Sequence, residues 1–198
     1  MTRILTRSAL TIALLVSSFS IAGCSLLTGK SDLLTVSDPG GLFHVKTPAD
    51  WSSHSQESFI AIYGSEDPPA SDVLNDISLG IFTTKDTTDS PVPEALSYVV
   101  ATRAQERSWT DADISEPADT EIGGRPGSVI EVTATDSQDV PFRAEYYFLR
   151  TSGQEVLVIA AAPAQMWDDS SKLIHTLITD EWYWHLSADQ GESTPTAQ

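Results

Sequence analysis

The chain has 198 residues, one cysteine and 40% hydrophobic residues, which suits one globular domain with terminal extensions. A single cysteine excludes an internal disulfide, a cysteine-based zinc finger and an iron–sulfur cluster. The 11 Lys and Arg residues stand against 28 Asp and Glu residues, for a formal charge of −17. This charge argues against a nucleic-acid partner, because the phosphates would repel so acidic a surface.

The N-terminal segment has the pattern of a bacterial export signal. Arg3 and Arg7 precede a mostly apolar run over residues 9–21, which is shorter than the ~20 residues that a membrane-spanning helix needs. The sequence Ile21-Ala22-Gly23-Cys24 then resembles the lipobox of bacterial lipoproteins. The resemblance implies cleavage after Gly23 and a diacylglycerol on the Cys24 thiol. The alternative is a plain secretory signal followed by a chance cysteine.

The lipobox divides the chain into four parts. Residues 1–23 are a signal peptide, and residues 24–40 are a lipidated cysteine with a flexible tether rich in Ser, Thr, Asp and Gly. Residues 41–185 form the folded domain. Residues 186–198 lack large apolar side chains, so they have nothing to bury and are expected to be a disordered tail. The two acyl chains of a diacylglycerol would give stable membrane attachment.

Strands are predicted in the folded part from alternating or β-branched runs. These runs cover residues 42–46, 58–63, 77–84, 128–135, 141–150 and 156–162. In the fifth run one face carries four apolar side chains, Phe142, Ala144, Tyr146 and Phe148. The last run is apolar throughout, which predicts a central strand that is covered on both faces.

Two helices complete the predicted fold. The first has Ser90 as its cap and Pro91 at its first position, and it ends near Trp109. The second lies within residues 164–179. Each has an apolar stripe that must pack against the sheet: Val92, Leu96, Val99, Val100 and Ala104 in the first, and Leu173, Ile174, Leu177 and Ile178 in the second. Because short turns join most strands, we expect an α+β fold, with an antiparallel β-sheet flanked by helices on both faces.

A family resemblance supports this fold. The run Gly41-Leu42-Phe43-His44-Val45-Lys46-Thr47-Pro48-Ala49-Asp50-Trp51 resembles the opening of PsbP-like domains, and Ile122-Gly123-Gly124-Arg125-Pro126-Gly127 resembles their mid-domain glycine turn. The chain is also similar to LpqN-type lipoproteins of actinobacterial envelopes. The resemblance covers residues 41–184 and implies a PsbP-like α/β/α sandwich that binds or stabilises a partner without catalysis. It implies no site residue, because the family has no shared catalytic motif.

Catalytic and metal-binding patterns are missing from the sequence. It has no Gly-x-Ser-x-Gly elbow, P-loop or Gly-x-Gly-x-x-Gly loop. We therefore expect no enzyme activity, no cofactor and no metal. The histidines His44, His54, His175 and His185 are expected to be surface or edge residues. Weak divalent-cation binding by loop acids stays an alternative, with Asp67, Asp72, Asp76, Asp111 and Asp113 as the candidates.

The sequence Trp182-Tyr183-Trp184 supplies the candidate partner surface. Trp182 matches the aromatic residue that closes the PsbP-like core. Neighbouring side chains in an extended segment point to opposite sides, so Tyr183 or Trp184 is expected on the surface. Exposed Tyr and Trp are favoured at binding sites.

Two functions are compatible with these features. The first is a lipid-anchored, non-catalytic binding or assembly module on the extracytoplasmic face of a bacterial cell membrane. Its partner would be an envelope protein or a glycolipid. The alternative is an envelope hydrolase that acts on a wall or lipid component. A pocket with perturbed carboxylates would favour the hydrolase, and an apolar cleft without convergent ionisable groups would favour binding.

Overall fold

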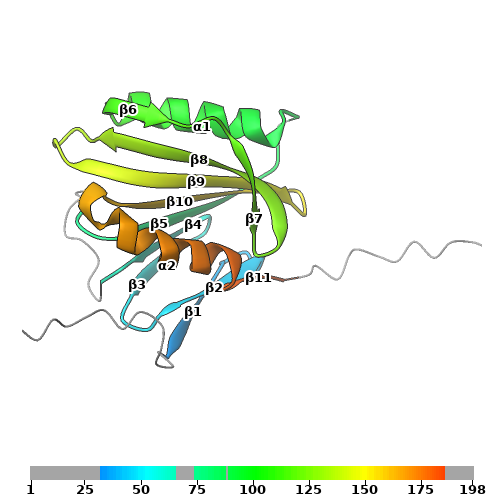
Figure 1. The fold of residues 1–198 in the computed structure, drawn as a ribbon. Helices are drawn as coiled ribbons and strands as arrows, with labels where there is room; N and C mark the ends of the chain where they lie inside the picture. The colour runs from blue at the N-terminus through cyan, green and yellow to red at the C-terminus, as the bar shows by residue number, and fades with distance from the viewer. Residues whose placement is uncertain (1–31, 66–73, 88, 186–198) are drawn as a thin grey trace, which may run out of the picture. The chain divides into compact units, whose positions relative to one another are not determined.

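The computed structural model describes residues 32–65, 74–87 and 89–185 (Figure 1). The predicted signal peptide, Cys24, the first residues of the expected tether and the expected tail 186–198 lie outside the described residues, as do Asp67 and Asp72. The lipid anchor and the tail therefore stay predictions. No helix in the described ranges is long and apolar enough to cross a membrane.

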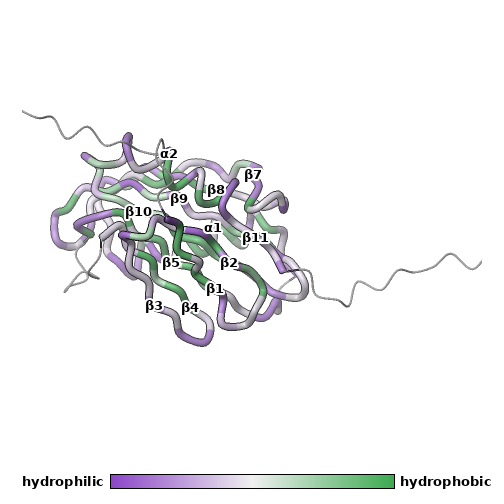
Figure 2. Tube along the Cα trace, turned by 90° about the horizontal axis from the view of Figure 1, so that it is seen from below, coloured by the Kyte–Doolittle hydropathy of each residue, from purple (hydrophilic) through white to green (hydrophobic). Residues whose placement is uncertain are grey.

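The described strands form two antiparallel sheets. The small sheet has the order β1-β2-β11, from Leu33–Ser37, Phe43–Pro48 and Trp182–Trp184. The large sheet has the order β3-β4-β5-β10-β9-β8-β6, and β7 pairs with the start of β8. Its strands are Ser52–Gln56, Phe59–Tyr63, Ser78–Lys85, Gln154–Pro163, Pro141–Thr151, Arg125–Thr135 and Thr110–Ile114, with Ala118–Ile122 as β7. Figure 2 shows hydrophobic residues along β2, β4 and β5, while the turn between β3 and β4 is hydrophilic.

Helix α1, Val92–Glu106, packs on one face of β8 and β9. The side chains predicted to share a face of β9 do so: Phe142, Ala144, Tyr146 and Phe148 are buried in one cluster with Leu96 and Val100 of α1. The predicted Ser90 cap is wrong. The residue that precedes the helix is Pro91, which has no side chain able to bond the free amides, and its carbonyl accepts a bond from Ala95 N at 3.0 Å.

Helix α2, Trp167–Thr179, follows a short 3₁₀ turn, Ala164–Met166, and packs in the other cluster. Its predicted inner stripe, Leu173, Ile174, Leu177 and Ile178, is buried. The same cluster holds Phe43 and Val45 of β2, Trp182 of β11, and Tyr147 and Leu149, the alternate residues of β9. Trp182 is a core residue, as predicted.

The antiparallel α+β fold is thus present, but not as a single sheet. Strands β1, β2 and β11 form their own sheet beside α2. Strand β10 is less covered than predicted: Val156 and Val158 are fully buried, whereas Leu157 and Ile159 on its opposite face are half-buried. The reason is that α1 lies over β8 and β9 and covers only part of that face.

The folded domain begins earlier than predicted, which corrects the tether. Residues 33–37, expected to be part of a flexible segment, form β1 and pair with β2. Val36 lies opposite Val45 and is buried in the core. The Asp38 carboxylate accepts a hydrogen bond from Leu42 N at 2.9 Å and fixes the turn between the two strands. The apolar contact of Val36 and the ladder hydrogen bonds offset the entropy of ordering this segment.

Three further strands, β3, β6 and β7, lack the apolar runs that sequence patterns detect. Strand β3 has the sequence Ser-Ser-His-Ser-Gln and lies at the edge of the large sheet. Asp111 and Asp113, predicted in a loop, lie in β6 and are exposed. Polar residues suit these strands because exposed edges are protected from further pairing by polar and charged side chains.

Candidate binding site

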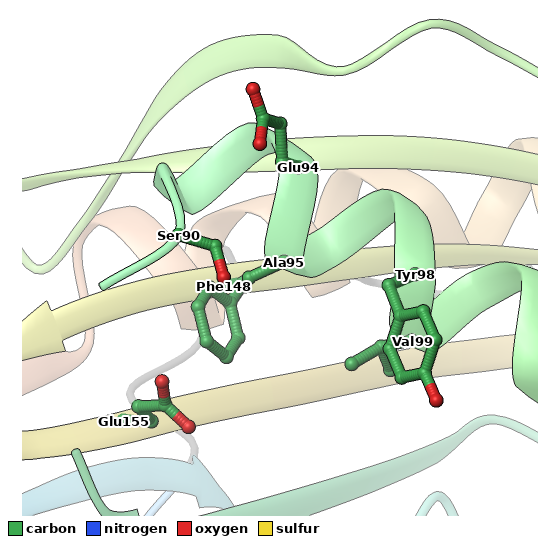
Figure 3. Close-up of a pocket in the computed structure, with 7 residues that line it drawn as sticks. All are labelled: Ser90, Glu94, Ala95, Tyr98, Val99, Phe148 and Glu155. Atoms are coloured by element: carbon green, nitrogen blue, oxygen red, sulfur yellow. The ribbon is translucent and has the colours of Figure 1, made fainter. Parts of the chain in front are cut away.

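A hollow of about 420 Å³ opens between α1 and the strands β9 and β10 (Figure 3). Its lining residues are Ser90, Glu94, Ala95, Tyr98, Val99, Phe148 and Glu155. Ala95 and Val99 are four residues apart on α1, so they lie on one face of the helix. The volume falls within the range that is usual for ligand pockets, ~300–1,000 Å³.

The walls of the hollow are mainly apolar. Phe148 is buried, with only 4% of its surface exposed, and it packs in the cluster beneath α1. Tyr98 stands at the rim with 74% of its surface exposed, which makes it the most exposed of the large hydrophobic side chains that the structure describes. A rigid aromatic side chain at the edge of an apolar hollow is suited to contact a partner.

The acidic groups of the hollow do not converge on one point. The Arg150 guanidinium donates to the Glu155 carboxylate at 2.9 Å, lies 3.4 Å from Asp86, and also donates to the Ser90 carbonyl. Glu94 points away from Phe148 and Glu155 in Figure 3. The lining contains no histidine, cysteine or lysine. The carboxylates of the lining are thus Glu94, which points away from the hollow, and Glu155, which is paired with Arg150.

Half-buried apolar side chains continue from the hollow across the large sheet. Leu157 of β10 lies opposite Phe82 of β5, and Phe82 lies opposite Phe59 of β4. The Phe59 and Phe82 ring centroids are 4.8 Å apart, and the Arg103 guanidinium of α1 lies over Phe82 at 5.3 Å. This apolar strip extends the surface that a partner could contact beyond the hollow itself.

Among the described residues, the carboxyl group whose pKa is shifted is that of Glu145, and it lies outside the hollow. Burial raises the pKa of the Glu145 carboxyl; the hydrogen bond from the Tyr147 hydroxyl opposes this effect, and the nearby Glu131 carboxylate adds to it. Glu145 lies opposite Glu131 across β8 and β9. It is next to Ala144 in β9, so it points to the face opposite the hollow. The Glu145 carboxyl therefore lies outside the hollow and cannot act there as a general acid.

Glu145→Gln should raise the free energy of unfolding at neutral pH. A raised pKa means that the folded state keeps its proton to higher pH than the unfolded state. Stability of the original chain therefore falls as the pH rises from about 4.5 through the folded value. Glutamine avoids this loss and can still accept the Tyr147 hydrogen bond. The gain should be present at pH values above the folded pKa and should vanish below about 4.5.

Urea denaturation at acid and at neutral pH measures this difference. Glu57→Gln is the control, because Glu57 is exposed in the turn after β3 and its substitution should change little. Destabilisation by Glu145→Gln at neutral pH would mean that attraction to Arg143 and His175 outweighs the burial of the carboxylate.

Tyr183 and Trp184, the two residues of the predicted partner surface, differ in how much of each side chain is exposed. Tyr183 is exposed to 38% of its surface. Trp184 is half-buried against the core, and its Nε1 donates to the Ile122 carbonyl at 2.8 Å. Arg125 covers the Trp184 ring, with its guanidinium 4.8 Å from the ring centroid. Tyr183 thus offers more free surface than Trp184, and the partner role of both residues stays a prediction.

The pairing of β2 with β11 brings together side chains that are far apart in the sequence. His44 stacks on Tyr183 with ring centroids 4.9 Å apart, and the Lys46 ammonium lies over the same Tyr183 ring, 4.7 Å from its centroid. His44 Nδ1 and His185 Nε2 are 2.8 Å apart. His54 and His175 are exposed, as predicted. Within the described ranges, no group of three or more His, Cys, Asp and Glu residues is arranged to hold a metal.

No family model and no curated protein matches this sequence. Solved structures nevertheless share its fold. The solution structure of cyanobacterial PsbP (CyanoP) from Synechocystis has a TM-score of 0.58 at 12% identity, and the match covers 83% of this chain and 99% of that one. The Ran-binding protein Mog1p of Saccharomyces cerevisiae has a TM-score of 0.54 at 9% identity, over 78% and 96% of the two chains.

A third similar structure is LpqN of Mycobacterium tuberculosis, described as involved in cell envelope biogenesis. Its TM-score is 0.50 at 12% identity, and the match covers 76% of this chain and 89% of LpqN. At such low identity these likenesses establish a PsbP-like and Mog1-like fold and nothing about activity.

Proposed function

We propose that this chain is a non-catalytic binding module of the bacterial cell envelope, attached to the extracytoplasmic face of the membrane by a lipid on Cys24. Its partner is an envelope protein that inserts an apolar side chain into the hollow beside α1. The observation that carries the binding role is the lining of that hollow: an apolar wall of Ala95, Val99 and Phe148 and an exposed aromatic rim at Tyr98.

The chemistry of the partner follows from the charges around the hollow. Glu94 is exposed at the rim, and the whole chain carries a formal charge of −17. A partner segment with Lys or Arg beside its apolar side chain would be complementary to this surface and would be attracted over a longer range. This complementarity favours a protein partner over an acidic glycolipid.

The lipid anchor is supported by the position of the only cysteine, directly after Ile21-Ala22-Gly23. Mass spectrometry of the mature N-terminus tests it: the proposal requires Cys24 as the first residue with a diacylglycerol on its sulfur. LpqN is described as involved in cell envelope biogenesis, which agrees with the proposed envelope location. The likeness itself is evidence for the fold alone. An unmodified N-terminus at another residue would contradict the anchor and leave the binding role to be judged by itself.

Ala95→Trp should abolish partner binding, because an indole at this position fills the hollow. Ala101→Trp is the matched control, since Ala101 is exposed on the same helix and does not line the hollow. Both variants would be crosslinked in intact envelopes, and the adduct would be quantified after purification. The proposal predicts a protein adduct for the original chain and for Ala101→Trp, and its loss in Ala95→Trp. An adduct of equal yield in all three, or one that contains only lipid, would contradict it.

A further inference from the structure

The outer face of the small sheet brings two histidines together, His44 and His185. His44 of β2 lies opposite Tyr183 of β11, so His185, two residues further on, is its diagonal neighbour on the same face. The two rings are in contact: His44 Nδ1 is 2.8 Å from His185 Nε2, and the ring planes meet at 62°. Because one nitrogen must donate and the other accept at this distance, at least one ring is neutral.

Both histidines are held by their surroundings. His44 lies within a strand that is paired on both sides, with β1 and with β11, and its ring stacks on Tyr183 at an interplanar angle of 13°. The backbone N–H of His185 donates to the Leu42 carbonyl at 2.9 Å. Ligand-bearing side chains on paired strands keep their geometry better than side chains on loops.

We propose that His44 and His185 form a two-histidine site for a divalent transition-metal ion such as Zn²⁺, bound through Nδ1 of His44 and Nε2 of His185. Water, or a donor atom from outside the chain, completes the coordination. This site is separate from the hollow beside α1 and does not depend on the binding role proposed above. The sequence could not indicate it, because the two residues are 141 positions apart.

The geometry requires only a small adjustment. With Zn–N bonds of about 2.0–2.1 Å and tetrahedral angles, two ligating nitrogens lie ~3.3 Å apart. The observed 2.8 Å therefore has to open by about half an ångström. Rotation of the His185 ring can supply this, since His185 is exposed at the surface.

The chemistry of imidazole favours a transition-metal ion over an anion at this pair. One of the two contacting nitrogens carries a proton, so binding a metal at both requires that this ring move its proton to its other nitrogen, as the two neutral tautomers of imidazole allow. A neutral imidazole with a lone pair on the ligating nitrogen is the form that binds metals. An anion would instead require protonated rings. The acidic chain attracts cations, and imidazole nitrogens select Zn²⁺, Cu²⁺ or Ni²⁺ over Ca²⁺ and Mg²⁺.

Calorimetric titration of the full chain with ZnCl₂ at about pH 7.5, above the ordinary pKa of a free histidine, tests the site. Loss of an outer-shell partner alone costs ~10–100-fold in metal affinity, so His44→Gln and His185→Gln should each weaken zinc binding at least ~10-fold. His175→Gln is the matched control, because His175 is exposed on α2 and should leave the affinity unchanged. MgCl₂ should give no binding heat that His44→Gln or His185→Gln removes.

Histidine nitrogen NMR identifies the ligating atoms. Zinc should shift the resonances of Nδ1 of His44 and Nε2 of His185 and leave those of His54 and His175 in place. His185 is exposed, so His185→Gln should keep the original melting temperature, whereas His44 is half-buried and stacks on Tyr183. The melting temperature of each variant separates loss of a ligand from loss of the fold. No zinc binding by the original chain, equal weakening by His175→Gln, or inorganic phosphate shifting the same two resonances without zinc would overturn the proposal.

Discussion

Replacement of Phe148 by alanine should destabilise the domain by about 3–5 kcal/mol, a large part of the ~5–15 kcal/mol that such a domain has. Phe148 is only 4% exposed and packs among Leu96, Val100 and Tyr146. Its ring also borders the hollow, so the enlarged space is partly open already, and the loss should lie near the lower end of the range. Chemical denaturation measures it.

Phe82→Ala is the control for this substitution. Phe82 lies two strands away on the same face and is only half-buried, so its removal should cost less. An ordinary single substitution costs about 1 kcal/mol. A loss below this value for Phe148→Ala would mean that α1 does not cover this part of the sheet and that Phe148 does not form a wall of the hollow.

Gly123→Ala should destabilise the domain by about 2–5 kcal/mol. Gly123 and Gly124 form the two-residue turn between β7 and β8, both with positive φ, which is the hairpin conformation that suits glycine. At Gly123 a Cβ atom would lie 2.7 Å from the Trp182 carbonyl oxygen and 2.9 Å from Trp184 Nε1. The expected loss combines ~1–2 kcal/mol of left-handed backbone strain with ~1–3 kcal/mol of overpacking.

Gly124→Ala separates these two contributions. Gly124 has a φ of +74°, but a Cβ atom there meets nothing within 4 Å. Its substitution should therefore show the backbone strain alone. Thermal or urea unfolding of both variants measures the difference, which should be ~1–3 kcal/mol. Equal losses in the two variants would show that the turn does not pack against β11 as described.

The parts of the fold that sequence patterns predict are those that bury an apolar face. Strand β2, one face each of β9 and β10, and both helices carry such faces, and these apolar faces form the two core clusters. The prediction went too far for Leu157 and Ile159 of β10 and for Val99 of α1, which are only half-buried. Strands β1, β3, β6 and β7 were not predicted, because most of their side chains are polar or exposed and the ladder hydrogen bonds define them instead. Backbone pairing of this kind leaves little trace in composition.

The candidate sites were predictable to a lesser degree. The alternation around Tyr183 indicated an exposed aromatic, and Tyr183 is exposed. Its contact with His44 depends on the pairing of β2 with β11, which no local pattern specifies. The hollow arises because α1 covers β8 and β9 but leaves space beside Phe148 and Glu155. Such a gap depends on how the helix packs on the sheet. Neither the sequence of the helix nor that of the strands reveals it alone.

The central claim is that the chain contacts its partner through the hollow beside α1. A photo-reactive phenylalanine in place of Tyr98, at the rim of the hollow, tests this most directly in intact envelopes, with the same group in place of Tyr183 as the comparison. We predict a discrete protein adduct from position 98 that disappears when Ala95→Trp is added. An adduct from position 183 alone, or one from position 98 that persists with Ala95→Trp, would contradict the account.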